Sequence, residues 1–290
     1  MNWLFDFPFI VRINTDAIDR AVRSFAASHA AFFGGIKGGL TNFVGAINWL
    51  LNHIPWFLLL ALVFFLGWKG HKRLRSGIAY SILLCIIGMF GLWGLMNLTL
   101  AIVLAGVTIA LLLGLPIGVL LSGSDRANQA ARPVLDMMQT MPVFVYLIPA
   151  VIFFGMGSAS AVIATVIYAM VPVVRLTSLG IRQVDVEVVE AARSFGSTKA
   201  QMLFKVQVPQ ALPTIMAGIN QTLMMAMSMV VTCSMIGARG LGNEVLIAVN
   251  RIEISRGFMA GSSVVILAIL LDRLTQGWFS GRKDAGDEQQ

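Results

Sequence analysis

Long apolar stretches separated by short polar segments run through most of the chain. Seven of them approach the roughly 20 apolar residues that a helix needs to cross the ~30 Å hydrocarbon core of a bilayer. The predicted spans are Ile54–Trp68, Gly77–Leu95, Leu98–Leu121, Leu135–Phe154, Ala159–Val174, Pro213–Ile236 and Phe258–Leu271. Because Pro142 and Pro149 interrupt the helical hydrogen-bond ladder, we expect the fourth span to kink or end early. The pattern predicts an all-α membrane protein with about seven transmembrane helices.

The segment before the first span has a mixed pattern at helical spacing. Its apolar positions are Phe43, Ile47, Leu50 and Leu51, and its polar positions are Asn42, Asn48 and Asn52. We expect an amphipathic helix lying in the membrane interface, with Trp49 and Trp56 at headgroup level. An irregular tail is the alternative.

Composition supports a membrane location independently of these patterns. Apolar residues make up 57% of the chain and charged residues only 12%, about half the charged fraction of a typical soluble domain. We therefore attribute the net charge of +7 to basic loops that face the cytoplasm and anionic lipid rather than to nucleic-acid binding. Cys85 and Cys233 both lie in apolar spans, so neither a disulfide framework nor a metal site is predicted.

The distribution of basic residues predicts an orientation. The loops after the first, third, fifth and seventh spans carry most of the lysine and arginine, and the loops after the second and fourth carry little. The positive-inside rule places the basic loops in the cytoplasm, the N-terminus outside and the C-terminus inside. Two segments disagree. The loop after the sixth span contains Arg239, Arg251 and Arg256, set against Glu244 and Glu253. The N-terminal tail contains Arg12, Arg20, Arg23 and Lys37, although most of these lie well before the first span, where the rule is weak.

Residues 183–212 form a mixed-charge segment between the fifth and sixth spans. Asp185 suits the N-cap of a first helix, and Gly196 suits its left-handed end. Thr198 and Gln201 have the spacing of a capping box for a second helix, which we expect Pro209 and Pro213 to stop before the next span. The segment therefore predicts a helix–glycine turn–helix outside the bilayer, offered to a soluble partner.

This segment resembles the EAA loop of ABC-importer permeases. Glu190, Ala191, Ala192, Gly196 and Pro209 match the family pattern at its spacing, and Val206 and Val208 stand where the pattern has Ile and Leu. Residues 135–149, 208–223 and 240–242 resemble the glycine betaine/proline permeases of that family. The similarity covers roughly Leu98–Thr275, the five-helix core of the type I permease fold, whereas the N-terminal third matches only in general plan.

The resemblance implies a set of partners. Two permease copies, expected to be a homodimer, would form the path, and two cytoplasmic ATPase subunits holding ATP and Mg²⁺ would drive it. Glu190 would make a polar contact with the ATPase, Ala191 and Ala192 would allow close packing, and Gly196 would form the turn. Because no large polar domain flanks the predicted spans, we expect a separate extracytoplasmic solute-binding protein. The implied solute is glycine betaine, proline or a related quaternary ammonium compound such as choline.

These inferences divide the chain into four parts. They are an N-terminal tail with the interfacial helix (residues 1–53), two accessory transmembrane helices (54–97), the permease core with its cytoplasmic loop (98–275) and a cytoplasmic tail (276–290). Polar residues predicted near or within the spans are candidates for the solute pathway, namely Gln139, Thr140, Asn220, Gln221 and Thr222. Hydrogen bonding between helices is the alternative role and the more frequent one for any single residue.

The chain carries no signature of its own catalysis. No P-loop follows its glycine pairs, its histidines are scattered, and no nucleophile–base arrangement is apparent. We therefore expect a non-catalytic transport subunit without cofactor or metal. The alternatives are an ABC permease for another solute, such as an amino acid or a sulfonate, or a secondary carrier. A carrier would need an intramembrane ion site and usually inverted repeats, and neither is visible. A membrane enzyme is the remaining class, disfavoured by the missing catalytic constellation.

Overall fold

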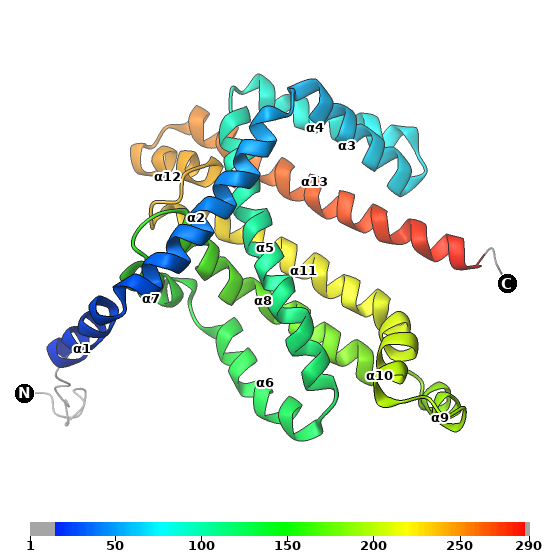
Figure 1. Ribbon diagram of the computed structural model, residues 1–290. Coiled ribbons are helices and arrows are strands. Elements are labelled where there is room, and N and C mark those ends of the chain that lie inside the picture. Colours follow the sequence, from blue (N-terminus) through cyan, green and yellow to red (C-terminus); the bar gives the residue numbers. More distant parts are fainter. Residues whose placement is uncertain (1–14, 288–290) are drawn as a thin grey trace, which may run out of the picture.

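The computed structural model describes residues 15–287, and all regular structure within that range is helical (Figure 1). The first six helices are α1 (Thr15–Ser28), α2 (Ala30–His53), α3 (Trp56–His71), α4 (Leu74–Met89), α5 (Trp93–Ser122) and α6 (Asp125–Thr140). They are followed by α7 (Val143–Phe154), α8 (Ser158–Arg182), α9 (Val186–Ser194), α10 (Lys199–Met202), the π-helical turn η1 (Leu203–Gln207), α11 (Val208–Ser234), α12 (Leu241–Arg251) and α13 (Ile254–Asp287). Residues 1–14 and 288–290 of the two predicted tails lie outside the described residues.

The helices confirm an all-α membrane fold. Within residues 15–287, four helical stretches are long and apolar enough to cross a bilayer, namely Trp93–Ser122, Ser158–Arg182, Lys199–Ser234 and Ile254–Gly277. Two bent pairs qualify only when joined, α2 with α3 and α6 with α7, and α4 is a shorter apolar helix. The four to six spans are close to the predicted number of about seven.

The second and fourth predicted spans are among those that differ from the structure. Pro142 disfavours helical backbone at the residue before it, so Met141 is extended (ψ 131°) and α6 meets α7 at 93°. The fourth predicted span is therefore a broken pair, as its prolines indicated, although Pro149 lies inside α7 without ending it. The second predicted span ran too far, because α4 ends at Met89 and Leu95 belongs to α5.

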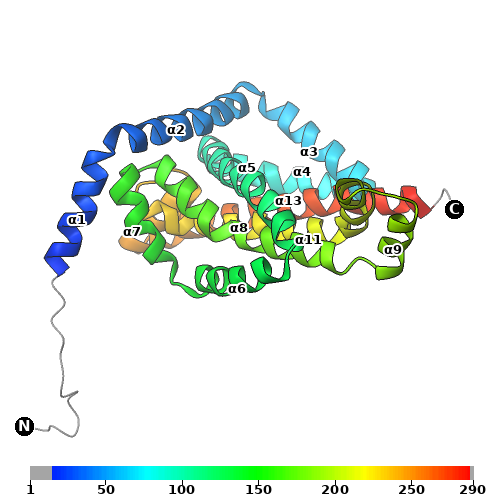
Figure 2. The same ribbon diagram turned by 60° about the horizontal axis from the view of Figure 1, so that its bottom comes forward.

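Small residues bring the central helices close together. Gly106, Ala110, Gly114 and Gly118 recur every four residues along α5, and the three glycines face side chains of α8: a Cβ added to Gly114 would lie 2.5 Å from Cγ1 of Val173. Such a line of small residues lets helix backbones approach within a membrane. On its other side α8 packs equally closely against α11, which makes α8 the most enclosed helix of the bundle (Figures 1 and 2).

Helix α2 crosses the ends of α5, α7 and α8 that lie opposite α9 and α10 (Figure 1). It bends away from α3 by 96°, and Val44, 3% exposed, is the centre of its inner face. A hydrogen bond from Asn97 to Asn52 (2.9 Å) ties it to α5. The expected helix is therefore present, but its face differs from the prediction: Phe43 and Leu50 point outward, because the bundle lies on the side of Val44.

The last helix is longer than predicted. Where the pattern gave a span over residues 258–271, α13 runs from Ile254 to Asp287, through most of the predicted C-terminal tail. The α3–α4 hairpin packs along it, with Gly70 close to the backbone of Gly277. The C-terminal end of α13 and the α9–α10 segment lie at the same end of the molecule, opposite α1 (Figure 1).

Candidate coupling element and membrane interior

Helix α9 begins as the sequence predicts. The Asp185 carboxylate accepts a hydrogen bond from the backbone N–H of Glu187 (2.9 Å) and caps the helix. Glu187 lies in the first turn, where its negative charge complements the positive end of the helix dipole. These two acids fix the point at which the chain turns out of α8 into α9.

Gly196 ends α9 in a left-handed conformation (φ +78°). The Ser197 N–H donates to the carbonyl of Ala192 (3.2 Å), and the Gly196 N–H donates to the carbonyl of Arg193 (2.9 Å). This pair of bonds is the Schellman motif, which requires a residue that adopts positive φ at the position of Gly196. The glycine turn expected between the two helices is therefore present.

The second helix starts with the predicted capping box. Gln201 N–H donates to the Thr198 hydroxyl (3.3 Å), and Thr198 N–H donates to the Gln201 side-chain oxygen (2.9 Å). The prediction that Pro209 and Pro213 stop this helix is wrong, since α10, η1 and α11 form one stretch from Lys199 to Ser234 that contains both prolines. The wider π turn lies directly before Pro209, where a proline ring would otherwise clash with the carbonyl four residues earlier.

We call the segment from Asp185 to Pro209 the coupling element. It protrudes at one end of the molecule (Figures 1 and 2), and Glu190 and Ala191 of the predicted contact are exposed there. Ala192, Val206 and Val208 are half-buried. Two exposed aromatic side chains, Phe195 (92% exposed) and Phe204 (65%), were not singled out from the sequence. The sequence feature that could have identified them is a large apolar residue within a mixed-charge segment.

A cleft of about 710 Å³ separates the coupling element from the ends of α5 and α8. Arg182, Arg193 and Lys199 line it, together with Asp125, which is ion-paired with Arg182. The cleft leaves α9 held mainly through its two ends. The coupling element is thus a well-capped helical unit that stands away from the bundle.

The predicted pathway residues fall into two groups, one with exposed side chains and one whose side chains are buried or hydrogen-bonded between helices. Gln139 and Thr140 are exposed at the end of α6, and Gln221 is exposed on α11. Asn220 instead bridges helices, donating to Asp272 of α13 (2.9 Å) and accepting from Thr275 (3.0 Å). Its hydrogen bonds match the helix–helix alternative named above.

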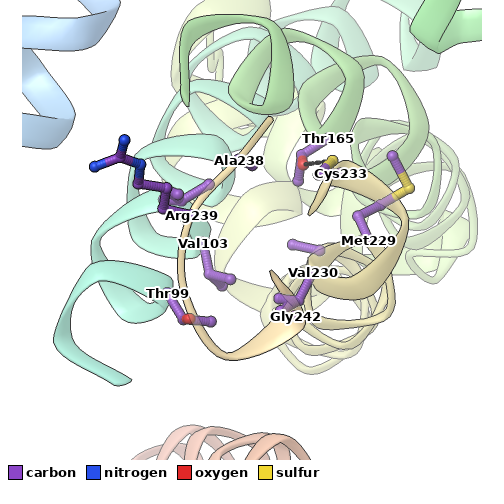
Figure 3. Close-up of a pocket in the computed structure, with 11 residues that line it drawn as sticks. Thr99, Val103, Thr165, Met229, Val230, Cys233, Ala238, Arg239 and Gly242 are labelled. Atoms are coloured by element: carbon purple, nitrogen blue, oxygen red, sulfur yellow. Dashed lines mark hydrogen bonds between the residues drawn. The ribbon is translucent and has the colours of Figure 1, made fainter. Parts of the chain in front are cut away.

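Thr222, the fifth predicted pathway residue, is fully buried in α11, and its hydroxyl has no partner within residues 15–287. Nearby on the same helix, a cavity of about 20 Å³ lies between α5, α8 and α11, beside the segment that leads into α12 (Figure 3). Thr165 and Cys233 meet beside it, and Arg239 points away from it. Ligand pockets for small molecules are typically ~300–1,000 Å³, so this cavity has room for about one water molecule.

The charged residues after the sixth predicted span form a compact cluster on α12 and α13. Arg256 pairs with Glu244 (2.7 Å) and with Glu253 (3.2 Å), and Arg251 lies 3.8 Å from Glu253. The positive-inside rule counts Lys and Arg whatever their partners, so this pairing does not bring the loop into line with the alternation of the basic loops. The cluster lies at the end of the molecule opposite the coupling element (Figure 1).

Comparison with known proteins identifies the family. Residues 106–280 match the family described as the binding-protein-dependent transport system inner membrane component. This range covers more than half of the chain. The chain belongs to this family. It is therefore a non-catalytic, multi-pass component of an inner-membrane transport system, and the resemblance to ABC-importer permeases is confirmed.

Two relatives align with nearly the whole chain. The glycine betaine/carnitine transport permease protein GbuB of Listeria monocytogenes serotype 1/2a (strain 10403S) is 48% identical over 256 residues, which cover 85% of this chain and 90% of the relative. The glycine betaine transport system permease protein OpuAB of Bacillus subtilis (strain 168) is 46% identical over 274 residues, covering 94% and 96%. Both alignments extend well beyond the core that carried the resemblance.

A solved structure confirms the fold of the core. A chain from the inward facing MetNI methionine ABC transporter aligns with a TM-score of 0.54 at 21% sequence identity, covering 64% of this chain and 90% of that chain. At this identity the likeness concerns the fold alone.

Among the described residues no group of three or more His, Cys, Asp or Glu side chains is arranged to hold a metal ion.

Proposed function

We propose that this chain is the permease subunit of an ATP-driven importer for glycine betaine or a related quaternary ammonium compound. The observation that carries the proposal is the 48% and 46% identity, over most of both chains, to permease proteins named for glycine betaine. Proline and choline, named from the sequence, remain secondary candidates. The aromatic cage that would bind such a cation belongs to the solute-binding protein.

The coupling element is the proposed contact with a cytoplasmic ATPase. Glu190 and Ala191 are exposed on α9 and available to a partner, while Gly196 fixes the turn. Because the helix from Lys199 to Ser234 is continuous, a displacement of the coupling element would tilt a whole membrane span. ATP and Mg²⁺ would bind in the ATPase, whose closure supplies the displacement.

The solute path is proposed to run between this chain and a second, identical copy. The cavity between α5, α8 and α11 of the single chain holds about 20 Å³, too little for any of the candidate solutes. The exposed side chains of Gln139, Thr140 and Gln221 are the stronger pathway candidates. Asn220 and Thr222 are better explained by helix packing.

The proposed orientation places the coupling element in the cytoplasm and α1, α2 and α12 at the outer face. A separate binding protein would deliver the solute to that face. The basic loops support this orientation by the positive-inside rule.

An uptake assay with the complete system tests the proposal. Vesicles containing this chain, its ATPase and its binding protein should accumulate labelled glycine betaine against a gradient when ATP is supplied. Accumulation should persist when an ionophore collapses the proton gradient at constant ATP. Uptake by this chain alone under an ion gradient would replace the importer with a secondary carrier. ATP-dependent uptake of an amino acid or a sulfonate alone would keep the importer and remove the glycine betaine assignment.

A further inference from the structure

A second polar pocket lies between α6 and α8, next to the cleft behind the coupling element, with which it shares Arg182. Its volume is about 240 Å³, and α6 runs alongside α8 at this point (Figures 1 and 2). The polar residues of its wall are Asn128, Arg132, Asp136, Arg175, Ser178 and Arg182. Three of these six are arginines, which makes the pocket a candidate site for an anion.

The charges around this pocket leave one positive charge in excess. Arg175 is ion-paired with Asp136, and Arg182 is ion-paired with Asp125, each through one terminal nitrogen. Arg132 has no ion-pair partner within residues 15–287. Three guanidinium groups therefore face two carboxylates. Because a guanidinium has five N–H donors, donors remain on all three for a further acceptor.

Ser178 supplies an independent sign of a missing partner. Its side chain lines the pocket and is 3% exposed, yet its hydroxyl has no hydrogen-bond partner within the described residues. Buried polar groups normally have one. The hydroxyl oxygen is covered, so a bound anion that reaches the arginines accepts from it once the Ser178 side chain turns toward the pocket.

The rest of the wall is apolar and identifies the kind of anion. Leu121, Leu135, Val174 and Leu179 complete the lining. Apolar side chains offer no favourable contact to a free phosphate ion. A phospholipid, in contrast, presents an anionic phosphate and an acyl chain side by side. Basic pockets between transmembrane helices on the cytoplasmic side suit anionic lipid headgroups.

We propose that this pocket binds an anionic phospholipid. Its phosphodiester contacts Arg132, Arg175 and the Ser178 hydroxyl, and an acyl chain lies along Leu135 and Leu179. The single negative charge of a phosphodiester matches the single excess positive charge of the pocket. Binding would also hold α6 against α8, the helix that leads directly into the coupling element.

Native mass spectrometry of the purified, detergent-solubilised transporter tests the site. Phosphatidylglycerol and phosphatidylcholine are titrated in parallel, and the lipid retained per permease chain is counted. Wild-type protein should retain phosphatidylglycerol in preference to phosphatidylcholine. Arg132→Gln should weaken phosphatidylglycerol retention by roughly tenfold. Arg126→Gln is the matched control, because Arg126 lies exposed on the same helix and outside the pocket, and should change retention little.

A second pair of variants separates binding from structural damage. Ser178→Ala should lower phosphatidylglycerol retention without lowering thermal stability in lipid-free detergent, since the hydroxyl it removes has no protein partner. Thr177→Val removes a neighbouring buried hydroxyl that also lacks a partner but does not line the pocket, and should leave retention unchanged. Equal loss in Ser178→Ala and Thr177→Val, or equal retention of the two lipids by wild type, would overturn the site.

Competition distinguishes a lipid from a free anion. Inorganic phosphate and deacylated glycerophosphoglycerol are added at millimolar concentration to the complex with phosphatidylglycerol. Failure of both to displace the lipid supports a site for headgroup and acyl chain together. Displacement by either one would overturn the phospholipid assignment and leave a site for a soluble phosphate.

Discussion

Single residues in this chain act in two different ways, and two glycines show the difference. Gly196 is needed for its backbone: its φ is +78°, and a Cβ added there would meet nothing within 4 Å. Gly114 is needed for its missing side chain, because its helical position leaves no room beside Val173. The first role could be predicted from local sequence. The second could not, because it depends on which helix packs opposite.

A first prediction tests whether coupling needs the left-handed turn at Gly196, where an added side chain would have room but would strain the backbone. Gly196→Val should reduce ATP-dependent uptake severalfold, because a β-branched residue in the left-handed region costs on the order of 1–2 kcal/mol and would distort the end of α9. Gly196→Asn is the matched control, since asparagine tolerates this conformation. Transport in vesicles, normalised to the amount of inserted protein, measures the effect. Equal activity of the two variants would show that the turn is not needed for coupling.

A second prediction concerns the exposed Glu190. Glu190→Lys should lower the amount of ATPase that co-purifies with the permease in mild detergent, since it reverses a charge at the proposed contact. Asp16→Lys makes the same charge reversal on exposed α1 at the other end of the molecule and should leave co-purification unchanged. If both variants retain the normal amount of ATPase, Glu190 lies outside the contact.

At the scale of elements, the positions of helices follow local signals and their faces follow packing. The helix break at Pro142 and the helix start at the Thr198 capping box could be predicted from sequence, because each depends only on the adjacent backbone. The continuation of the helix past Pro209 could not, because it depends on a π turn that absorbs the proline. The inner face of α2 could not be predicted either, because Val44 is buried only through its packing against α5 and α8.

A third prediction tests the close contact between α5 and α8. Gly114→Val should lower the midpoint of thermal unfolding in detergent, because overpacking a tight helix contact typically costs about 1–3 kcal/mol. Gly94→Val is the control on the same helix, where an added Cβ meets nothing within 4 Å. A similar loss for both would mean that the effect comes from β-branching in α5 rather than from the contact with α8.

At the scale of the whole molecule, one helix connects two distant regions. The stretch Lys199–Ser234 begins in the coupling element and reaches the small cavity through Met229 and Cys233. Asn220, midway along it, is hydrogen-bonded to α13. A movement of the coupling element would therefore reach the small cavity near α12 and also α13. No local sequence pattern indicates this connection, because it depends on contacts between residues more than 50 positions apart.

The last prediction concerns orientation, which the helices alone leave undecided because the bundle could face either way. The Lys and Arg residues of the loops at the coupling end favour a cytoplasmic coupling element. In a background without Cys85 and Cys233, a single cysteine replacing Ser197 should react with an impermeant thiol reagent only after the cells are opened. One replacing Ser28, on exposed α1 at the other end, should react in intact cells. The reverse pattern would invert the molecule in the membrane, and Glu190 and Gly196 would then face away from any cytoplasmic ATPase.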